Sequence, residues 1–171
     1  SSDLCNFDSI YHQKGIITAF KEAGYQTAFF SNQRYNHSFI DFFGKEADTF
    51  DFIKEDSLDS AYNPSDDELL ALVAKELSKG NQKQFIVLHT YGSHFNYRER
   101  YPSEDAFFLP DYPVEAEVKY RDNLVNAYDN TIRYTDGFLS RLIHMLEEQH
   151  VDAAMLYTSD HGEDIFDDSR H

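Results

Sequence analysis

Two short apolar runs, residues 26–31 and 84–89, are bounded by polar residues on both sides. Runs of this length without strict polar-apolar alternation are typical of strands that are buried on both faces of a sheet. Residues 152–158 have the same character and predict a third strand. A polar loop follows each run, at residues 32–36, 90–94 and 159–163, so each predicted strand ends in side chains that can carry chemistry.

Helical periodicity separates these strands. Apolar residues three and four positions apart predict helices over residues 11–24, from the end of a turn at residues 63–67 to near Gly80, and over residues 115–149. Ser65 with Glu68 three residues later has the pattern of a capping box. Residues 39–52 mix aromatic and acidic side chains and predict an irregular or short helical segment. Residues 95–114 hold three of the four prolines and predict a surface excursion over one end of the sheet.

Helices that alternate with short strands imply an α/β fold in which helices cover both faces of a mainly parallel central sheet. Three strands make a small sheet. We therefore expect residues 1–171 to be a single partial domain, incomplete in this chain.

Composition narrows the class of protein. The net charge is -16, the opposite of the basic footprint that nucleic-acid binding requires. An anionic substrate is still compatible with this charge, because a bound dication reverses the local field. No apolar run approaches the roughly 20 residues of a membrane span, and the single cysteine excludes a disulfide within the chain.

Ligands of open α/β sheets bind at the carboxyl ends of the strands, where the three polar loops are expected to meet. Asp160 and His161 offer one carboxylate and one imidazole, both ordinary zinc ligands, and Glu163 is placed to orient a ligand. The alternative is an ordinary acidic turn. His94 follows the second strand and suits binding or protonating a phosphate oxygen, with a solvated loop histidine as the alternative.

Asn32, Gln33 and His37 follow the first strand, where they are placed to contact substrate. Capping of the loop by asparagine, together with a solvated histidine, is the alternative explanation for these three residues.

Three segments carry a family resemblance: Leu88-His-Thr-Tyr-Gly-Ser-His94, Arg100-Tyr-Pro102 and Tyr157-Thr-Ser-Asp-His-Gly-Glu163. Together they resemble the membrane-anchored phosphoethanolamine transferases, in the sulfatase branch of the alkaline phosphatase superfamily. The resemblance spans nearly the whole chain. It implies an alkaline-phosphatase-like three-layer sandwich and an enzyme of the inner membrane, anchored upstream of this chain, with its catalytic domain facing the periplasm.

The resemblance also implies a reaction. A zinc-dependent enzyme would transfer phosphoethanolamine from a phospholipid donor to a lipid A or core sugar acceptor, through a phosphorylated threonine. Asp160 and His161 match the family's metal ligands, and His94 matches its phosphate-binding histidine. The loop with Asn32, Gln33 and His37 matches, more loosely, the segment that holds the donor headgroup.

The chain also departs from the family. The nucleophilic threonine and the first metal-binding acid would lie upstream of residue 1, and His171 lacks the neighbours expected of a further metal ligand. We therefore expect an internal piece of the catalytic domain that binds zinc weakly and transfers nothing by itself.

Three other readings stay open. A sulfatase or phosphodiesterase-type hydrolase is the first, although Cys5 lies outside the motif that sulfatases need for their nucleophile. A glycerophosphate transferase of the same superfamily, which commonly uses Mn²⁺, is the second. A catalytically inactive binding domain is the third.

Overall fold

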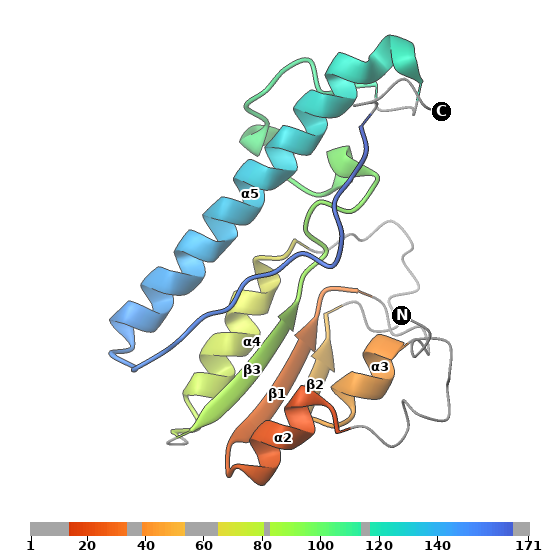
Figure 1. Cartoon of the computed structure of the whole chain (residues 1–171). Coiled ribbons are helices and arrows are strands. Elements are labelled where there is room, and N and C mark those ends of the chain that lie inside the picture. Colours follow the sequence, from red (N-terminus) through yellow and green to blue (C-terminus); the bar gives the residue numbers. More distant parts are fainter. Residues whose placement is uncertain (1–13, 34–38, 54–64, 81–82, 114–116, 166–171) are drawn as a thin grey trace. The chain divides into compact units, whose positions relative to one another are not determined.

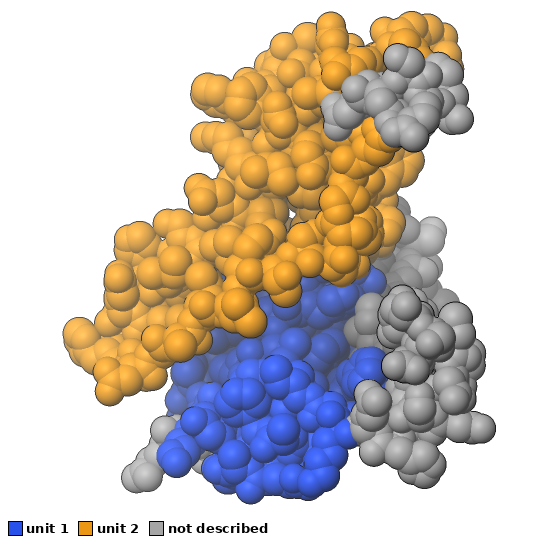
Figure 2. Space-filling model, viewed as in Figure 1, with its two compact units in different colours: residues 1–64, 68–90 blue, residues 65–67, 91–171 orange. Residues whose placement is uncertain are grey.

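The computed structural model describes residues 14–33, 39–53, 65–80, 83–113 and 117–165. The chain divides into two compact units, coloured separately in Figure 2. Unit 1 comprises Ser1–Pro64 and Glu68–Thr90, and unit 2 comprises Ser65–Asp67 and Tyr91–His171. No helix among the described residues has the length and apolar character that crossing a bilayer requires.

Unit 1 is built on a parallel sheet with the strand order β2-β1-β3 (Figure 1). Strands β1 (Gln26–Ser31) and β3 (Gln84–His89) are the first two predicted strands, and their parallel pairing confirms the expected sheet type. Strand β2 (Thr49–Phe52) pairs with the other edge of β1. It lies in the segment predicted as irregular or helical, which also contains the short helix α3 (Phe39–Gly44).

Helices cover both faces of this sheet. Helix α2 (Ile16–Glu22) buries Ile17 against Phe29 and Phe52 on one face, where α3 also lies (Figure 1). Helix α4 (Glu68–Leu77) lies against the opposite face, on which β1 buries Ala28 and Phe30. The arrangement of helix, sheet and helix agrees with the predicted three-layer α/β sandwich.

Unit 2 is dominated by the long helix α5 (Arg121–Glu148), shorter at its start than the predicted helix over residues 115–149. Three short 3₁₀ helices precede it: η2 (Tyr97–Glu99), η3 (Ser103–Asp105) and η4 (Val118–Tyr120). Tyr97, Leu124, Ala127 and Ile165 form its apolar core. The core therefore joins η2, α5 and the segment that follows α5.

The predicted strand over residues 152–158 is wrong. This segment is extended but pairs with no strand in the part of the chain that the structure describes, and Leu156 is 90% exposed. Its apolar side chains match the pattern of a buried strand. That pattern reports only a preference for burial, whereas pairing also needs a neighbouring strand in register, a long-range condition that local residues do not encode.

The turn predicted before the second helix is confirmed in the part of it that the structure describes, where residues 66–67 form a turn. Helix α4 begins at Glu68, and the Ser65 hydroxyl accepts a hydrogen bond from the Asp67 amide at 3.1 Å in the turn before it. Ser65 thus stabilises the turn that leads into the helix. Residues 11–13 of the first predicted helix lie outside the described residues.

Candidate functional site

The candidate residues are divided between the two units. Asn32 and Gln33 follow β1 in unit 1, whereas His94, Asp160 and His161 belong to unit 2. His37 lies outside the described residues. The structure thus brings three of the six candidates into one compact unit.

Asn32 closes the end of the strand pair in unit 1. Its amide donates to the carbonyl of His89 at 3.0 Å, and its side chain is buried. The next amide, of Gln33, donates to the hydroxyl of Ser31 at 3.0 Å, and this hydroxyl also contacts Nδ1 of His89 at 2.9 Å. The backbone at the carboxyl end of β1 is therefore fixed, which sets the positions of the side chains that leave it.

In unit 2, the His94 loop (residues 91–94) is held by a carboxylate distant in sequence. The buried Asp66 accepts the amides of Tyr91 at 2.8 Å and Gly92 at 2.9 Å, one with each oxygen. Gly92 has φ 55°, a backbone conformation that a side chain disfavours. Farther along, the hydroxyls of Ser93 and Thr131 are 2.7 Å apart. The loop is thus fixed by both the turn before α4 and by α5.

Arg100 fixes the carboxyl end of this loop. Its guanidinium lies 3.9 Å from the centre of the Tyr91 ring, and its Nε donates to the carbonyl of His94 at 2.9 Å. Burial lowers the pKa of Arg100, with nearby Tyr91 and the acids Glu99 and Asp66 acting in the opposite direction. A buried arginine that stacks on a ring while bonding a carbonyl is a rigid support.

His94 itself is exposed on this rigid loop. Its ring meets the ring of Tyr91 edge-on, with centroids 5.5 Å apart. Its Nδ1 hydrogen-bonds the carbonyl of Phe95, which fixes the proton on that nitrogen and leaves Nε2 to face a ligand. A fixed backbone with an exposed imidazole suits the binding of an anionic group from solution.

Replacing Arg100 by lysine is expected to loosen the His94 loop by about 1–2 kcal/mol, because lysine keeps the charge but loses the planar stack and the Nε bond. The measurement is hydrogen exchange of the His94 amide, which donates to the carbonyl of Tyr91 at 3.3 Å. Exchange should accelerate roughly tenfold.

Arg121→Lys is the matched control, since Arg121 lies at the exposed start of α5. If the His94 amide exchanges as slowly in Arg100→Lys as in the unaltered chain, Arg100 does not hold the loop.

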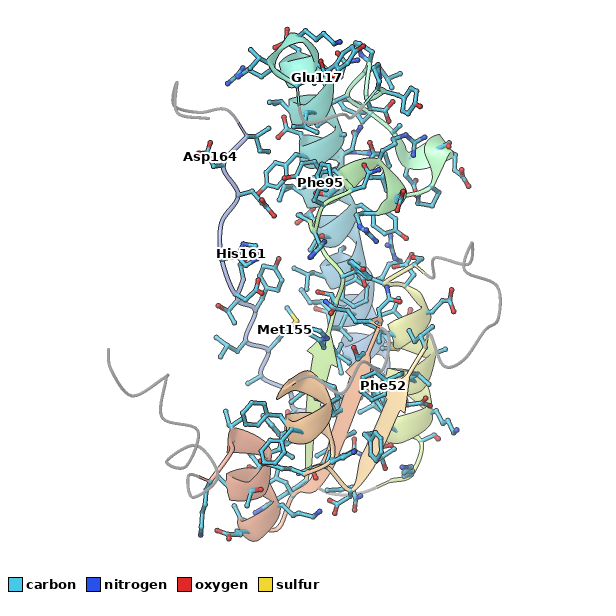
Figure 3. The ribbon with its side chains drawn as sticks, turned by 90° about the vertical axis from the view of Figure 1, so that its right-hand side faces the viewer. Phe52, Phe95, Glu117, Met155, His161 and Asp164 are labelled. Atoms are coloured by element: carbon cyan, nitrogen blue, oxygen red, sulfur yellow. The ribbon has the colours of Figure 1, made fainter. Side chains whose placement is uncertain are left out.

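Asp160 and His161 lie on the extended segment after α5, and Figure 3 shows His161 between Met155 and Asp164. Oδ2 of Asp160 is 3.8 Å from Nε2 of His161. Zinc binds oxygen and nitrogen ligands at about 2 Å, so two ligands of one ion lie within about 4 Å of each other. The separation therefore fits two positions on a single ion.

A hydrogen bond also orients the ring of His161. Nδ1 of His161 donates to the carbonyl of Gly162 at 2.8 Å, which leaves Nε2 as the nitrogen available to a metal. The Gly162 carbonyl, and then the charge of Asp160, raise the pKa of His161. No group of three or more histidine, cysteine or acidic side chains that suits a metal occurs within the described residues. Asp160 and His161 would fill two positions of a zinc shell that normally has four.

Glu163, which the sequence placed as a residue that orients a metal ligand, hydrogen-bonds the Tyr97 hydroxyl. Burial, followed by the charge and hydrogen bond of Glu163, raises the pKa of Tyr97. Ile165 packs in the same core as Tyr97. The segment carrying Asp160 and His161 is therefore anchored on η2, which follows the His94 loop by two residues. The His94 loop and the segment with Asp160 and His161 are therefore both attached to η2.

The supporting residues Asp66, Arg100 and Thr131 were not predicted. Asp66 sits in an apparent helix start, and nothing near it in sequence indicates a partner 25 residues away. Arg100 belongs to a segment that carries the family resemblance, which is the one signal that distinguished it.

The chain is similar to known proteins in sequence and in fold. A family model described as Sulfatase matches residues 5–171. Kdo(2)-lipid A phosphoethanolamine 7''-transferase of Escherichia coli (strain K12) is 36% identical over 102 residues, which are 58% of this chain and 18% of that protein. The chain thus spans about a fifth of the length of this curated relative.

Two solved structures share the fold. The integral membrane protein lipooligosaccharide phosphoethanolamine transferase A (EptA) of Neisseria meningitidis superposes with a TM-score of 0.69 at 27% identity, over 81% of this chain and 26% of that chain. The C-terminal periplasmic domain of EptC from Escherichia coli, in a complex with Zn, has a TM-score of 0.69 at 24% identity, over 80% and 39%. The predicted α/β fold is confirmed.

Proposed function

Since this chain belongs to the sulfatase family, we propose that the protein containing it is a metal-dependent phosphoethanolamine transferase. The observation that carries the proposal is the pair Asp160 and His161, whose 3.8 Å separation and oriented Nε2 fit one metal ion. The names of the relatives, which are phosphoethanolamine transferases, support the choice of reaction within the family.

In this proposal Asp160 and His161 hold Zn²⁺, with Mn²⁺ as the alternative. The ion, when bound, polarises the phosphoryl group and lowers the pKa of the attacking hydroxyl. His94 binds or protonates a phosphate oxygen through Nε2, on a loop that Asp66 and Arg100 keep from moving. Asn32, Gln33 and His37 contact the donor headgroup. Exposure of the histidine and rigidity of its support are what a group that positions an incoming phosphate requires.

The reaction has two steps. A threonine hydroxyl outside these 171 residues attacks the phosphorus of the phospholipid, the bond to the diacylglycerol oxygen breaks, and that oxygen takes up a proton. An acceptor hydroxyl or phosphate of lipid A or a core sugar then attacks the phosphothreonine and releases the threonine. Diacylglycerol and modified acceptor are the products, without a net redox change.

The lipid substrates place the reaction at a membrane. We propose the periplasmic side of the inner membrane, with an anchor carried by another part of the protein. The single family match over residues 5–171 supports the view that both units belong to one catalytic domain. The net charge of -16 argues against a nucleic-acid partner.

The proposal is tested by incubating the purified protein that contains this chain with phosphatidylethanolamine and lipid A. Mass spectrometry should show lipid A that has gained phosphoethanolamine, with an equal amount of diacylglycerol. A chelator should stop the reaction, and added zinc should restore it. Release of free phosphoethanolamine without a modified acceptor would instead identify a hydrolase, and no diacylglycerol under any condition would favour an inactive binding domain.

A further inference from the structure

The loop over residues 107–112 in unit 2 exposes its apolar side chains and buries its charged one. Phe107, Leu109 and Tyr112 are 65%, 66% and 69% exposed, whereas Asp111, the only charged residue of the loop, is 7% exposed. Loops of soluble proteins normally do the opposite, because a charge is stabilised by water and an aromatic side chain by burial. This reversed distribution of apolar and charged side chains is favourable when the loop faces an apolar medium.

The inward charge is fixed by specific partners. Nε of Arg98 lies 3.0 Å from Oδ2 of Asp111, and the hydroxyl of Tyr101 donates to the same oxygen at 2.9 Å. Burial raises the pKa of Tyr101 to about 12, so the hydroxyl keeps its proton and remains a donor. Asp111 therefore stays inside, and its neighbours in the loop are directed outward.

Helix α5 holds the backbone of this loop with three asparagines on one helical face, at spacings of three and four. Asn123 donates to the carbonyl of Tyr112 at 2.7 Å, and Asn126 to that of Pro110 at 2.9 Å. Asn130 accepts the amides of residues 107 and 108, both at 2.9 Å. The apolar side chains are thus presented by a rigid scaffold, so little further ordering is needed when they bind.

One cation lies directly beside the apolar side chains of the loop. The guanidinium of Arg133 lies 4.9 Å from the Phe107 ring centre, and the exposed helix η4, which precedes α5, carries the ion pair of Lys119 and Glu117 at 2.8 Å. A cation at this position suits the phosphate of a lipid headgroup. A strongly anionic surface would be repelled by a chain with a net charge of -16.

We propose that residues 107–112 insert into the surface of a bilayer with zwitterionic headgroups. Aromatic side chains favour this interfacial zone, and removing each apolar side chain from water stabilises the bound state. A stable protein interface instead uses about 20–30 residues on each side, far more than this loop offers. This proposal rests on the proposed function in one respect only, the choice of lipid, because the phospholipid named here is also the proposed donor.

The absence of tryptophan from the 171 residues gives a clean test. Leu109→Trp in the full 171-residue chain carries the sole indole, which is titrated with phosphatidylcholine–phosphatidylethanolamine vesicles. Its emission should shift to shorter wavelength, and brominated lipids should quench it. Ile143→Trp, on the exposed part of α5, is the matched control and should not respond. Tyr112→Trp serves as a second reporter if Leu109→Trp fails to fold.

An unchanged spectrum from a folded reporter would overturn the proposal, as would a response confined to anionic vesicles. A blue shift that grows with protein concentration in the absence of lipid would also overturn it, and would assign the loop to contact between copies of the chain. Because no acceptor is present, transfer does not influence the readout. Failure of vesicle binding by the folded chain would therefore contradict this proposal alone, whatever the transfer activity of the protein that contains the chain.

Discussion

Replacing Asp160 by alanine should lower phosphoethanolamine transfer by the protein that contains this chain on the order of a thousandfold. A metal ion stabilises the charge of a phosphoryl transition state by several kcal/mol, and each 1.4 kcal/mol, roughly, is a tenfold change in rate. Asp160 supplies one of the two proposed ligand atoms, which lie 3.8 Å apart. The measurements are the rate of diacylglycerol release and the zinc content by elemental analysis.

Asp152→Ala is the matched control, because it removes the same charge from the same exposed segment, eight residues away. Its transfer rate and zinc content should stay at the level of the unaltered protein. Near-normal transfer by Asp160→Ala would show that Asp160 is not a ligand. Equal losses in both variants would point to the charge of the segment instead of a specific metal site.

Replacing Asn130 by alanine should lower the free energy of unfolding of unit 2 by about 3 kcal/mol. Asn130 is 1% exposed and makes four hydrogen bonds. It accepts the amides of Phe107 and Phe108 and donates to the carbonyl of Phe108 and the hydroxyl of Tyr101. Alanine leaves these groups without their partner, so the loss exceeds that of a single surface hydrogen bond.

Urea unfolding followed by circular dichroism measures this loss, and hydrogen exchange of the Phe107 and Phe108 amides localises it. Asn126→Ala is the control, because Asn126 makes one exposed bond to the Pro110 carbonyl and should cost about 1 kcal/mol. If both variants lose the same stability and the two amides remain protected in Asn130→Ala, the central role of Asn130 is refuted.

The fold could be predicted wherever a segment's own residues determine its environment. Strands β1 and β3 were found because both are continuously apolar, although only β1 is buried on both faces and β3, at the edge of the described sheet, is half-buried along its length. Strand β2 was missed because its Phe50 is 44% exposed and the strand is four residues long, so it lacks that signature. Residues 152–158 are also largely apolar but have no strand partner in the described chain. Their composition therefore does not distinguish them from β1 and β3.

The site was predictable only in part, for a related reason. His94, Asp160 and His161 have side chains whose chemistry is visible in the sequence. Their supports act across long separations: Asp66 binds amides 25 and 26 residues away. No structural role was predicted for the asparagines on α5, because periodicity arguments weigh apolar residues. Their spacing along one face is a signal that counting polar residues by the same period would have revealed.

Residues 65–67 join unit 2 although the chain on either side of them belongs to unit 1. The hydroxyls of Ser65 and Tyr134 form a hydrogen bond, and Asp67 pairs with Arg141 at 2.7 Å, 74 residues later. During synthesis, β1 and β3 can pair as soon as residue 89 has emerged, and Asp66 finds its partners once Tyr91 and Gly92 follow, whereas Ser65 and Asp67 must wait for α5. Closing so long a loop slows folding more than it weakens the folded state. The turn before α4 therefore reaches its final conformation in two stages, and the Asp67 carboxylate remains in water until the second.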